Sequence, residues 1–119
     1  MSTRPAAKLT YTALLGRILQ HHRQRLGLQQ SDVADALGIL QPAYSRIEKG
    51  DTSITVVQLR IVANKLGMAP AQILHEVEQW VQQLRTQGVT VTDEREVPRA
   101  ALLIGLGILA AALLAASRA

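Results

Sequence analysis

The segment from Leu28 to Gly50, LQQSDVADALGILQPAYSRIEKG, constrains the fold more than any other part of this 119-residue chain. It contains two short runs of apolar residues at helical spacing, the first followed by Gly38 and the second by Gly50. A glycine directly after a periodic apolar segment favours the left-handed conformation that closes a helix. The segment therefore predicts two short helices joined by a tight turn.

Three further glycines, Gly27, Gly67 and Gly88, also follow periodic apolar segments, and the spacing as a whole predicts five helices. We expect them at about residues 11–26, 30–37, 41–49, 55–66 and 70–87. Thr55 and Gln58 have the spacing of a capping box. Because the chain has no Phe and only one Trp, its core must consist of Leu, Ile, Val and Ala. The predicted fold class is all-α.

The sequence divides into five successive parts. The expected parts are a flexible polar arm at 1–10, a helical domain at 11–75, an extension of the fifth helix at 76–87, a linker at 88–99 with room for a short strand at 89–91, and an apolar helix at 100–117.

The fifth predicted helix carries an apolar seam longer than a minimal domain requires. Ile73, Val77, Trp80 and Leu84 alternate steps of four and three residues, which is the pattern of two heptads. We expect this seam to form a dimer contact. The alternative is that it packs against its own domain.

Residues 100–116, AALLIGLGILAAALLAA, contain no polar side chain. A helix of this length is at the short end of what spans a bilayer, and a buried helix of a soluble protein usually keeps a polar stripe. The sequence therefore predicts a single transmembrane helix at residues 100–117 that contacts lipid. It would hold the N-terminal domain on the cytoplasmic face of the inner membrane. Burial of the tail against a partner protein is the alternative.

Composition excludes several kinds of site. The absence of Cys rules out disulfides, thiolate metal sites and a cysteine nucleophile. His21, His22 and His75 lack partners at ligand spacing, so a solvated helix face is expected for them, with no metal and no cofactor. No nucleophile–base pair or phosphate loop stands out, and we do not expect an enzyme. Residues 1–74 carry nine Lys and Arg against four Asp and Glu, a balance that suits contact with phosphates.

The identities of the residues in this region indicate more than their spacing does. The residues concerned are Arg23, Leu28, Gln30, Val33, Ala34, Leu37, Gly38, Ile39, Gln41, Tyr44, the run Ser45–Gly50, Ala63, Leu66, Gly67, Met68, Ile73 and Leu74. With these residues, the segment from about 15 to 74 resembles the helix-turn-helix domain of the XRE family, the Cro and phage-repressor type. The resemblance implies that the helix at 41–49 enters the major groove of double-stranded DNA.

The resemblance also implies residue roles. Tyr44 and Ile47 are three residues apart and face the core, which leaves an outer face on the same helix. The residues implied at base edges are Gln41, Pro42, Ser45 and Arg46; those implied at phosphates are Gln30, Lys49, Thr52 and Ser53; Arg23 and Glu48 are implied to form a structural salt bridge.

Two positions depart from the family pattern. Gln29 and Leu40 stand where Ser or Thr usually caps a helix, and each is a poor cap. Leu40 also places an apolar group beside the expected DNA surface. The leading hypothesis is a dimeric transcription regulator tethered to the cytoplasmic membrane. The alternatives are a membrane-anchored module of the RodZ type that binds a protein partner, and a soluble antitoxin-like regulator.

Overall fold

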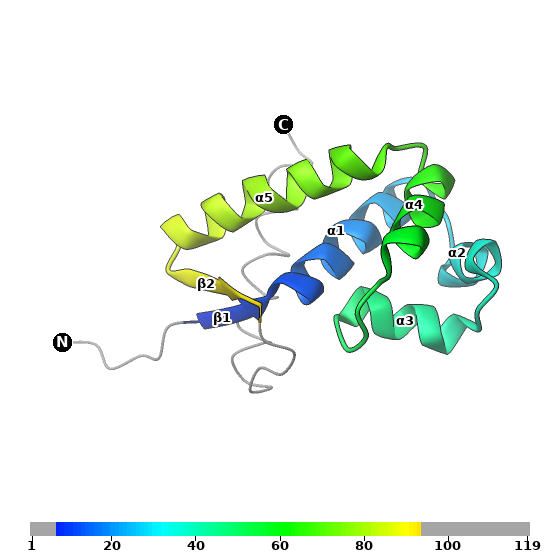
Figure 1. The fold of residues 1–119 in the computed structure, drawn as a ribbon, viewed down its shortest axis with the longest axis horizontal. Coiled ribbons are helices and arrows are strands. Elements are labelled where there is room, and N and C mark those ends of the chain that lie inside the picture. Colours follow the sequence, from blue (N-terminus) through cyan, green and yellow to red (C-terminus); the bar gives the residue numbers. More distant parts are fainter. Residues whose placement is uncertain (1–6, 94–119) are drawn as a thin grey trace.

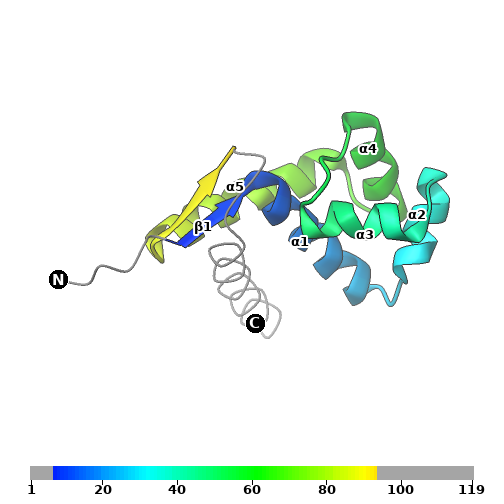
Figure 2. The same cartoon turned by 90° about the horizontal axis from the view of Figure 1, so that it is seen from below.

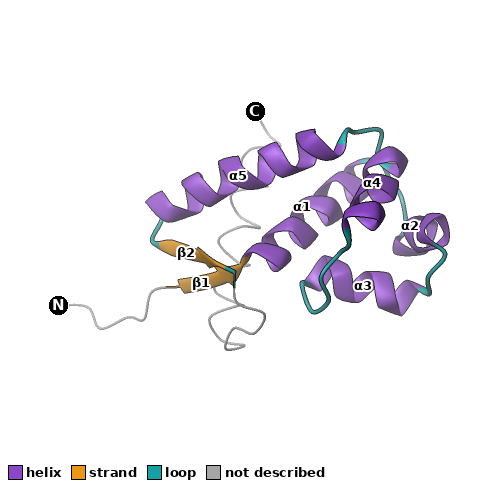
Figure 3. Cartoon of the chain, viewed as in Figure 1, coloured by secondary structure: helices purple, strands orange, loops and turns teal. Residues whose placement is uncertain are grey.

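The computed structural model describes residues 7–93, and within them the chain forms five helices and two short strands (Figure 1; Figure 3). In chain order the elements are β1 (Ala7–Thr10), α1 (Tyr11–Arg25), α2 (Gln30–Leu37), α3 (Gln41–Lys49), α4 (Val56–Lys65), α5 (Pro70–Thr86) and β2 (Val89–Thr92). The five helices begin and end within about two residues of the predicted positions.

Local capping explains where most of these helices begin. The Thr10 hydroxyl oxygen accepts a hydrogen bond from the Ala13 amide at 3.0 Å and starts α1. The capping box predicted at Thr55 and Gln58 is confirmed at the start of α4. No side-chain cap is present at Leu40, and α3 instead begins with Pro42, whose fixed backbone angle suits a first turn.

All five glycines predicted to end helices have positive φ angles. Gly50 shows why only glycine fits. Its φ is +81°, and a Cβ added there would lie 2.5 Å from the Cα of Ala13 in α1. The end of α3 therefore depends on both the conformational freedom and the small size of glycine.

The helices pack around α1. Viewed as in Figure 1, α1 and α5 run beside each other, with α2, α3 and α4 grouped at one end and the strands at the other. In Figure 2, seen from the side of α3, that helix lies across the front of the group. The core contains only aliphatic side chains and one tyrosine: Leu9, Ala13, Leu14, Leu15, Ile18, Leu19, Val33, Ala34, Tyr44, Ile47, Leu59, Val62, Ala63, Leu66, Ile73, Val77, Leu84 and Val89. Apart from Tyr44, this composition agrees with the prediction.

Glycine at position 16 brings α1 and α3 unusually close. A Cβ built on Gly16 would lie 2.3 Å from the carbonyl oxygen of Glu48 and 2.6 Å from that of Ile47. Real Cβ atoms essentially never approach so closely. The backbone of α3 therefore rests directly on α1.

The strands correct the expectation of an all-α fold. Residues 7–10, expected in a flexible arm, pair in parallel with residues 89–92, where the linker had room for a short strand at 89–91, and Leu9 lies opposite Val91. The physical reason is burial, because Leu9 and Val89 are 0% and 1% exposed and join the core. The helical domain lies between the two strands in sequence, as a parallel pair requires a long crossover.

The dimer contact expected on α5 is also corrected. The side chains of Ile73, Val77 and Leu84 are fully buried, and Trp80 is partly buried. They pack inside the domain, where α5 contacts α1 and β2. The seam therefore belongs to the core of one chain, which is the alternative that the pattern left open.

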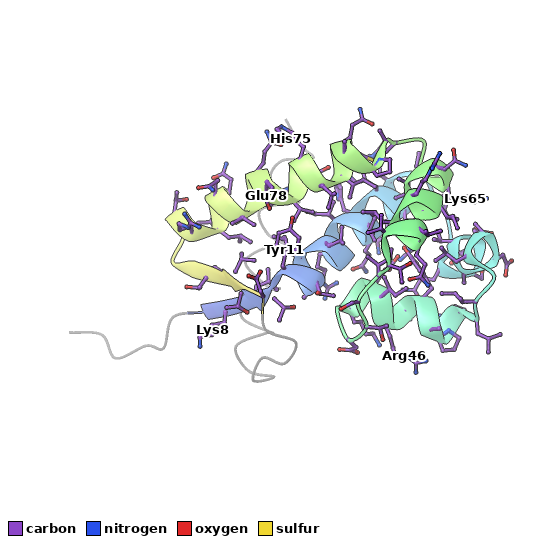
Figure 4. All side chains as sticks on the ribbon, viewed as in Figure 1. Lys8, Tyr11, Arg46, Lys65, His75 and Glu78 are labelled. Atoms are coloured by element: carbon purple, nitrogen blue, oxygen red, sulfur yellow. The ribbon has the colours of Figure 1, made fainter. Side chains whose placement is uncertain are left out.

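Two side-chain contacts also join α1 to α5. His22 Nε2 lies 2.7 Å from Glu76 Oε2, with only 12% of the histidine side chain exposed, which corrects the expectation of a solvated histidine face for this residue. The Tyr11 hydroxyl donates to Glu78 Oε2 at 2.8 Å (Figure 4). Burial lowers the pKa of His21, and the neighbouring His22 lowers it further.

The predicted transmembrane helix at 100–117 and residues 94–99 of the predicted linker lie outside the described residues. Among residues 7–93, none of the helices combines the length and the apolar character needed to cross a bilayer.

Candidate nucleic-acid interface

One face of α3 is buried and the other is free. Tyr44 and Ile47 lie in the core, whereas Gln41, Pro42 and Arg46 are exposed. In Figure 4 the side chain of Arg46 points away from the rest of the domain. The nine-residue helix therefore presents an exposed face that is polar apart from Pro42.

The other residues predicted to contact DNA lie around this surface. Ser45 is half-buried on the outer side of α3, and Lys49 is exposed at the end of the helix. Thr52 and Ser53 are exposed in the following loop. With Thr12, Gly50 and Asp51 they line a hollow of about 330 Å³. The Asp51 carboxylate makes this hollow a poor phosphate site, so Lys49 carries most of the positive charge at this end.

A second hollow, of about 310 Å³, lies at the start of α2. It is lined by Arg23, Gln29, Gln30, Ser31 and Gln41. None of these five side chains is acidic, but Asp32 lies in the first turn of α2 and accepts a hydrogen bond from the Gln29 amide at 2.7 Å. The positive end of the helix dipole favours an anion such as a phosphate here, whereas the charge of Arg23 is paired with Glu48.

The predicted ion pair of Arg23 with Glu48 is present beneath α3. Arg23 Nε donates to Glu48 Oε2 at 2.7 Å, and Nη2 donates to Oε1 at 3.0 Å. Arg23 Nη1 donates to the carbonyl oxygen of Leu28 at 2.9 Å. The two residues are 7% and 2% exposed. The hydrogen bonds that Arg23 donates to Glu48 raise the pKa of Arg23, so the guanidinium stays charged.

Tyr44 packs beside this pair. Burial raises the pKa of its hydroxyl, and the negative charge of Glu48 raises it further. The Tyr44 hydroxyl therefore stays protonated. Arg23 is then the one charged residue beside Glu48 in the core of the described domain.

The structure adds a link that sequence reasoning missed. Gln41 Nε2 donates to Gln30 Oε1 at 2.7 Å, and Gln30 Nε2 donates to Glu48 Oε1 at 2.9 Å. The exposed amide at the start of α3 is thereby connected to the buried ion pair. No local sequence signal announces this contact, because the three residues come from two helices and are 11 and 18 positions apart.

Leu40 occupies the edge of the same surface with 79% of its area exposed. It directly precedes α3 and has no cover in the described part of the chain. An apolar side chain here can contact a thymine methyl group or an apolar group of another protein.

Comparison with known proteins agrees with this geometry. No curated protein matches the chain. Two crystal structures of the clp gene regulator ClgR from Corynebacterium glutamicum are similar. One is 23% identical, with a TM-score of 0.61 over 65% of this chain and 82% of that one. The other is 24% identical, with a TM-score of 0.55 over 59% and 91%. These likenesses concern the fold. Residues 19–73 match the helix-turn-helix family model, so this part of the chain is a helix-turn-helix domain.

Proposed function

We propose that the protein is a sequence-specific DNA-binding transcription regulator that places α3 in the major groove. The observation that carries this proposal is the polar outer face of α3, which is supported from below by a buried ion pair. The major groove admits an α-helix, and α3 is a nine-residue helix with one face exposed.

The proposed base contacts follow from side-chain chemistry. Arg46 can donate two hydrogen bonds to guanine, and Gln41 can pair with adenine. Pro42 and Ser45 lie between them in the helix and would contact neighbouring base edges. Each good bidentate contact is worth about 1–3 kcal/mol of discrimination.

Phosphates would be bound on either side of this face. Gln30 and the start of α2 supply donors on one side, and Lys49 with Thr52 and Ser53 supplies them on the other. Such contacts fix the orientation of the protein and make binding depend strongly on salt.

We further propose that two copies act together. A single α3 contacts only a few base pairs, and paired helix-turn-helix domains bind half-sites about 34 Å apart on a palindromic sequence. Because Ile73, Val77 and Leu84 are buried within one chain, the proposed contact between copies would use other residues. The similar protein ClgR is described as a gene regulator, which agrees with a regulatory role.

The apolar tail supports a second part of the proposal, attachment to the cytoplasmic membrane. Residues 100–116 carry no polar side chain, so a helix there would gain free energy in lipid. Fractionation of cells tests this point. Full-length protein should remain with the membranes after a salt wash and dissolve in detergent. Release into the aqueous fraction would refute the tether.

The runner-up is a protein-binding module, and the exposed Leu40 favours it. Titration of full-length protein with double-stranded DNA at several salt concentrations separates the two. We expect Arg46→Ala to weaken binding about tenfold or more. Arg85→Ala, which removes an exposed arginine at the far end of α5, should bind like the wild type. Absence of DNA binding by the wild type at low salt would refute the proposal.

A further inference from the structure

The two-stranded sheet has an open edge along β2. Within residues 7–93, the backbone of Val89–Thr92 forms hydrogen bonds only with β1. In Figure 2, no other described element lies along the outer side of β2. A strand at the edge of a sheet presents a row of unpaired backbone N–H and C=O groups, which can bind a further strand.

The two edges of this sheet differ in charge. β1 carries Lys8, which is exposed and is the register partner of Thr90. A lysine on an edge strand is a common device against unwanted strand pairing. β2 has the sequence VTVT, in which all four residues are β-branched and none is charged. The edge of β2 therefore suits a further strand better than the edge of β1 does.

The sequence of β2 is complementary to itself. Directly opposed residues of antiparallel strands have their side chains on the same face of the sheet. Two copies of VTVT related by a twofold axis therefore place valine opposite valine and threonine opposite threonine. The valines would extend the core, since Val89 is 1% exposed and Val91 is partly buried against it.

We propose that β2 pairs antiparallel with β2 of a second copy of this chain, so that two sheets join into one of four strands. The strands lie at the opposite end of the domain from α2, α3 and α4, so this contact leaves the outer face of α3 uncovered (Figure 1). The inference identifies the contact between copies in the proposed function, and it rests on that function only for its role on DNA.

The hydroxyl of Thr92 favours one register of this contact. Its Oγ1 atom is buried and has no hydrogen-bond partner among the described residues. Buried polar groups are nearly always hydrogen-bonded, so an added partner would be favourable. With the twofold axis at Val91, Thr92 lies opposite Thr90 of the second copy, and threonines in such pairs form hydrogen bonds. An axis at Thr90 would instead place Thr92 opposite Gly88, which has no side chain.

Disulfide cross-linking tests the contact, because the chain has no cysteine of its own. Full-length Thr90→Cys and Thr92→Cys proteins are mixed in detergent, allowed to exchange subunits and oxidised mildly. Opposed residues of antiparallel strands have Cα atoms about 4.5–5.5 Å apart, which a disulfide can span. The mixture should therefore give several times more covalent dimer than either protein alone, in which the cysteines would be diagonal neighbours about 7–8 Å apart.

Lys8→Cys is the matched control. Lys8 is exposed in the same sheet, but in the four-stranded arrangement it would lie at least about 14 Å from Lys8 of the second copy. This variant should not cross-link. Equal cross-linking by Lys8→Cys and by the mixture, or no covalent dimer from the mixture, would overturn the contact. Thr90→Cys that cross-links alone as well as the mixture would overturn the register.

A charge on the open edge provides a second test. Thr90→Lys removes the threonine pairs and brings two like charges together, so it should raise the dissociation constant of the dimer about fivefold or more. Sedimentation of full-length protein in detergent measures this constant. Gln83→Lys, at an exposed position of α5, adds the same charge away from the edge and should leave it unchanged. A monomeric wild type, or a Thr90→Lys dimer as stable as the wild type, overturns the proposal.

These measurements are independent of DNA. If the wild type forms the cross-linked dimer but binds no DNA, the proposed function fails and the strand contact stands. If the wild type binds DNA but the strand contact fails these tests, the proposed function stands and the inference is overturned. Where both hold, Thr90→Lys should weaken binding to a palindromic site and leave binding to a single half-site unchanged.

Discussion

Replacement of Gly16 by alanine tests the close contact between α1 and α3. In an ordinary helix this change is favourable by about 1 kcal/mol, because alanine has the higher helix propensity. Here the new Cβ would lie 2.3 Å from the Glu48 carbonyl oxygen and 2.7 Å from the Glu48 carbonyl carbon. These are backbone atoms of a packed helix, so no flexible side chain can move aside.

The clash should outweigh the propensity. Overpacking costs about 1–3 kcal/mol, and a rigid backbone neighbour puts Gly16→Ala near the upper value. Subtraction of the helix gain leaves a net loss of about 2 kcal/mol. For a domain of this size, this loss lowers Tm by roughly 8–16 °C.

Thermal unfolding followed by circular dichroism measures this effect. Gln24→Ala, at an exposed position of the same helix, is the control and should change Tm by only a few degrees. A Gly16→Ala protein that melts at or above the wild-type temperature would show that α3 does not rest on α1 at this distance, and the argument for a rigidly supported α3 would lose its basis.

Three further predictions concern single side chains. Glu48→Ala leaves the Arg23 charge buried without a partner and should lower the free energy of unfolding by about 3–5 kcal/mol. Arg46→Ala should leave that free energy unchanged. Equal urea midpoints for the two variants would contradict a structural role for Glu48. Thr10→Ala removes the cap of α1 and should cost about 1 kcal/mol, with a fall in Tm as the readout. Burial and the bond to Glu78 raise the pKa of Tyr11 to about 12, so its contribution to stability is complete below pH 10 and is lost as the pH rises towards 12. Tyr11→Phe should therefore reduce the fall in Tm between pH 9 and 11, and an unchanged alkaline slope would reject this role.

The positions of the helices were predictable because their signals are local. Each helix combines an apolar face with a nearby stop, as at Gly38 and Gly50, and such signals need no information about distant residues. The pairing of Arg23 with Glu48 was predictable only through the family resemblance, since nothing in the spacing of two charges shows that they meet in the core.

The pairing of the strands and the packing partner of the α5 seam could not be predicted from the sequence. Two four-residue strands about eighty positions apart carry no local sign of their pairing. The strands become buried only because the helices between them in sequence fold and bring them together. The seam at Ile73, Val77 and Leu84 revealed an apolar face but not what covers it, because packing within one chain and packing between two chains require the same period.

The Glu48 carboxylate accepts hydrogen bonds from both Arg23 and Gln30, and this explains why an ion pair occupies this part of the core. Measured by stability alone, two apolar side chains of similar volume can replace a buried ion pair without loss. Such a pair would offer no acceptor to Gln30, and the amide of Gln41 would then be free to turn. Since Arg23 donates to one carboxylate oxygen of Glu48 and shares the other with Gln30, the charge of the pair is neutralised while one acceptor remains directed towards Gln30 in α2. The buried carboxylate thus connects the packing of α1 against α3 to the surface that would contact the bases.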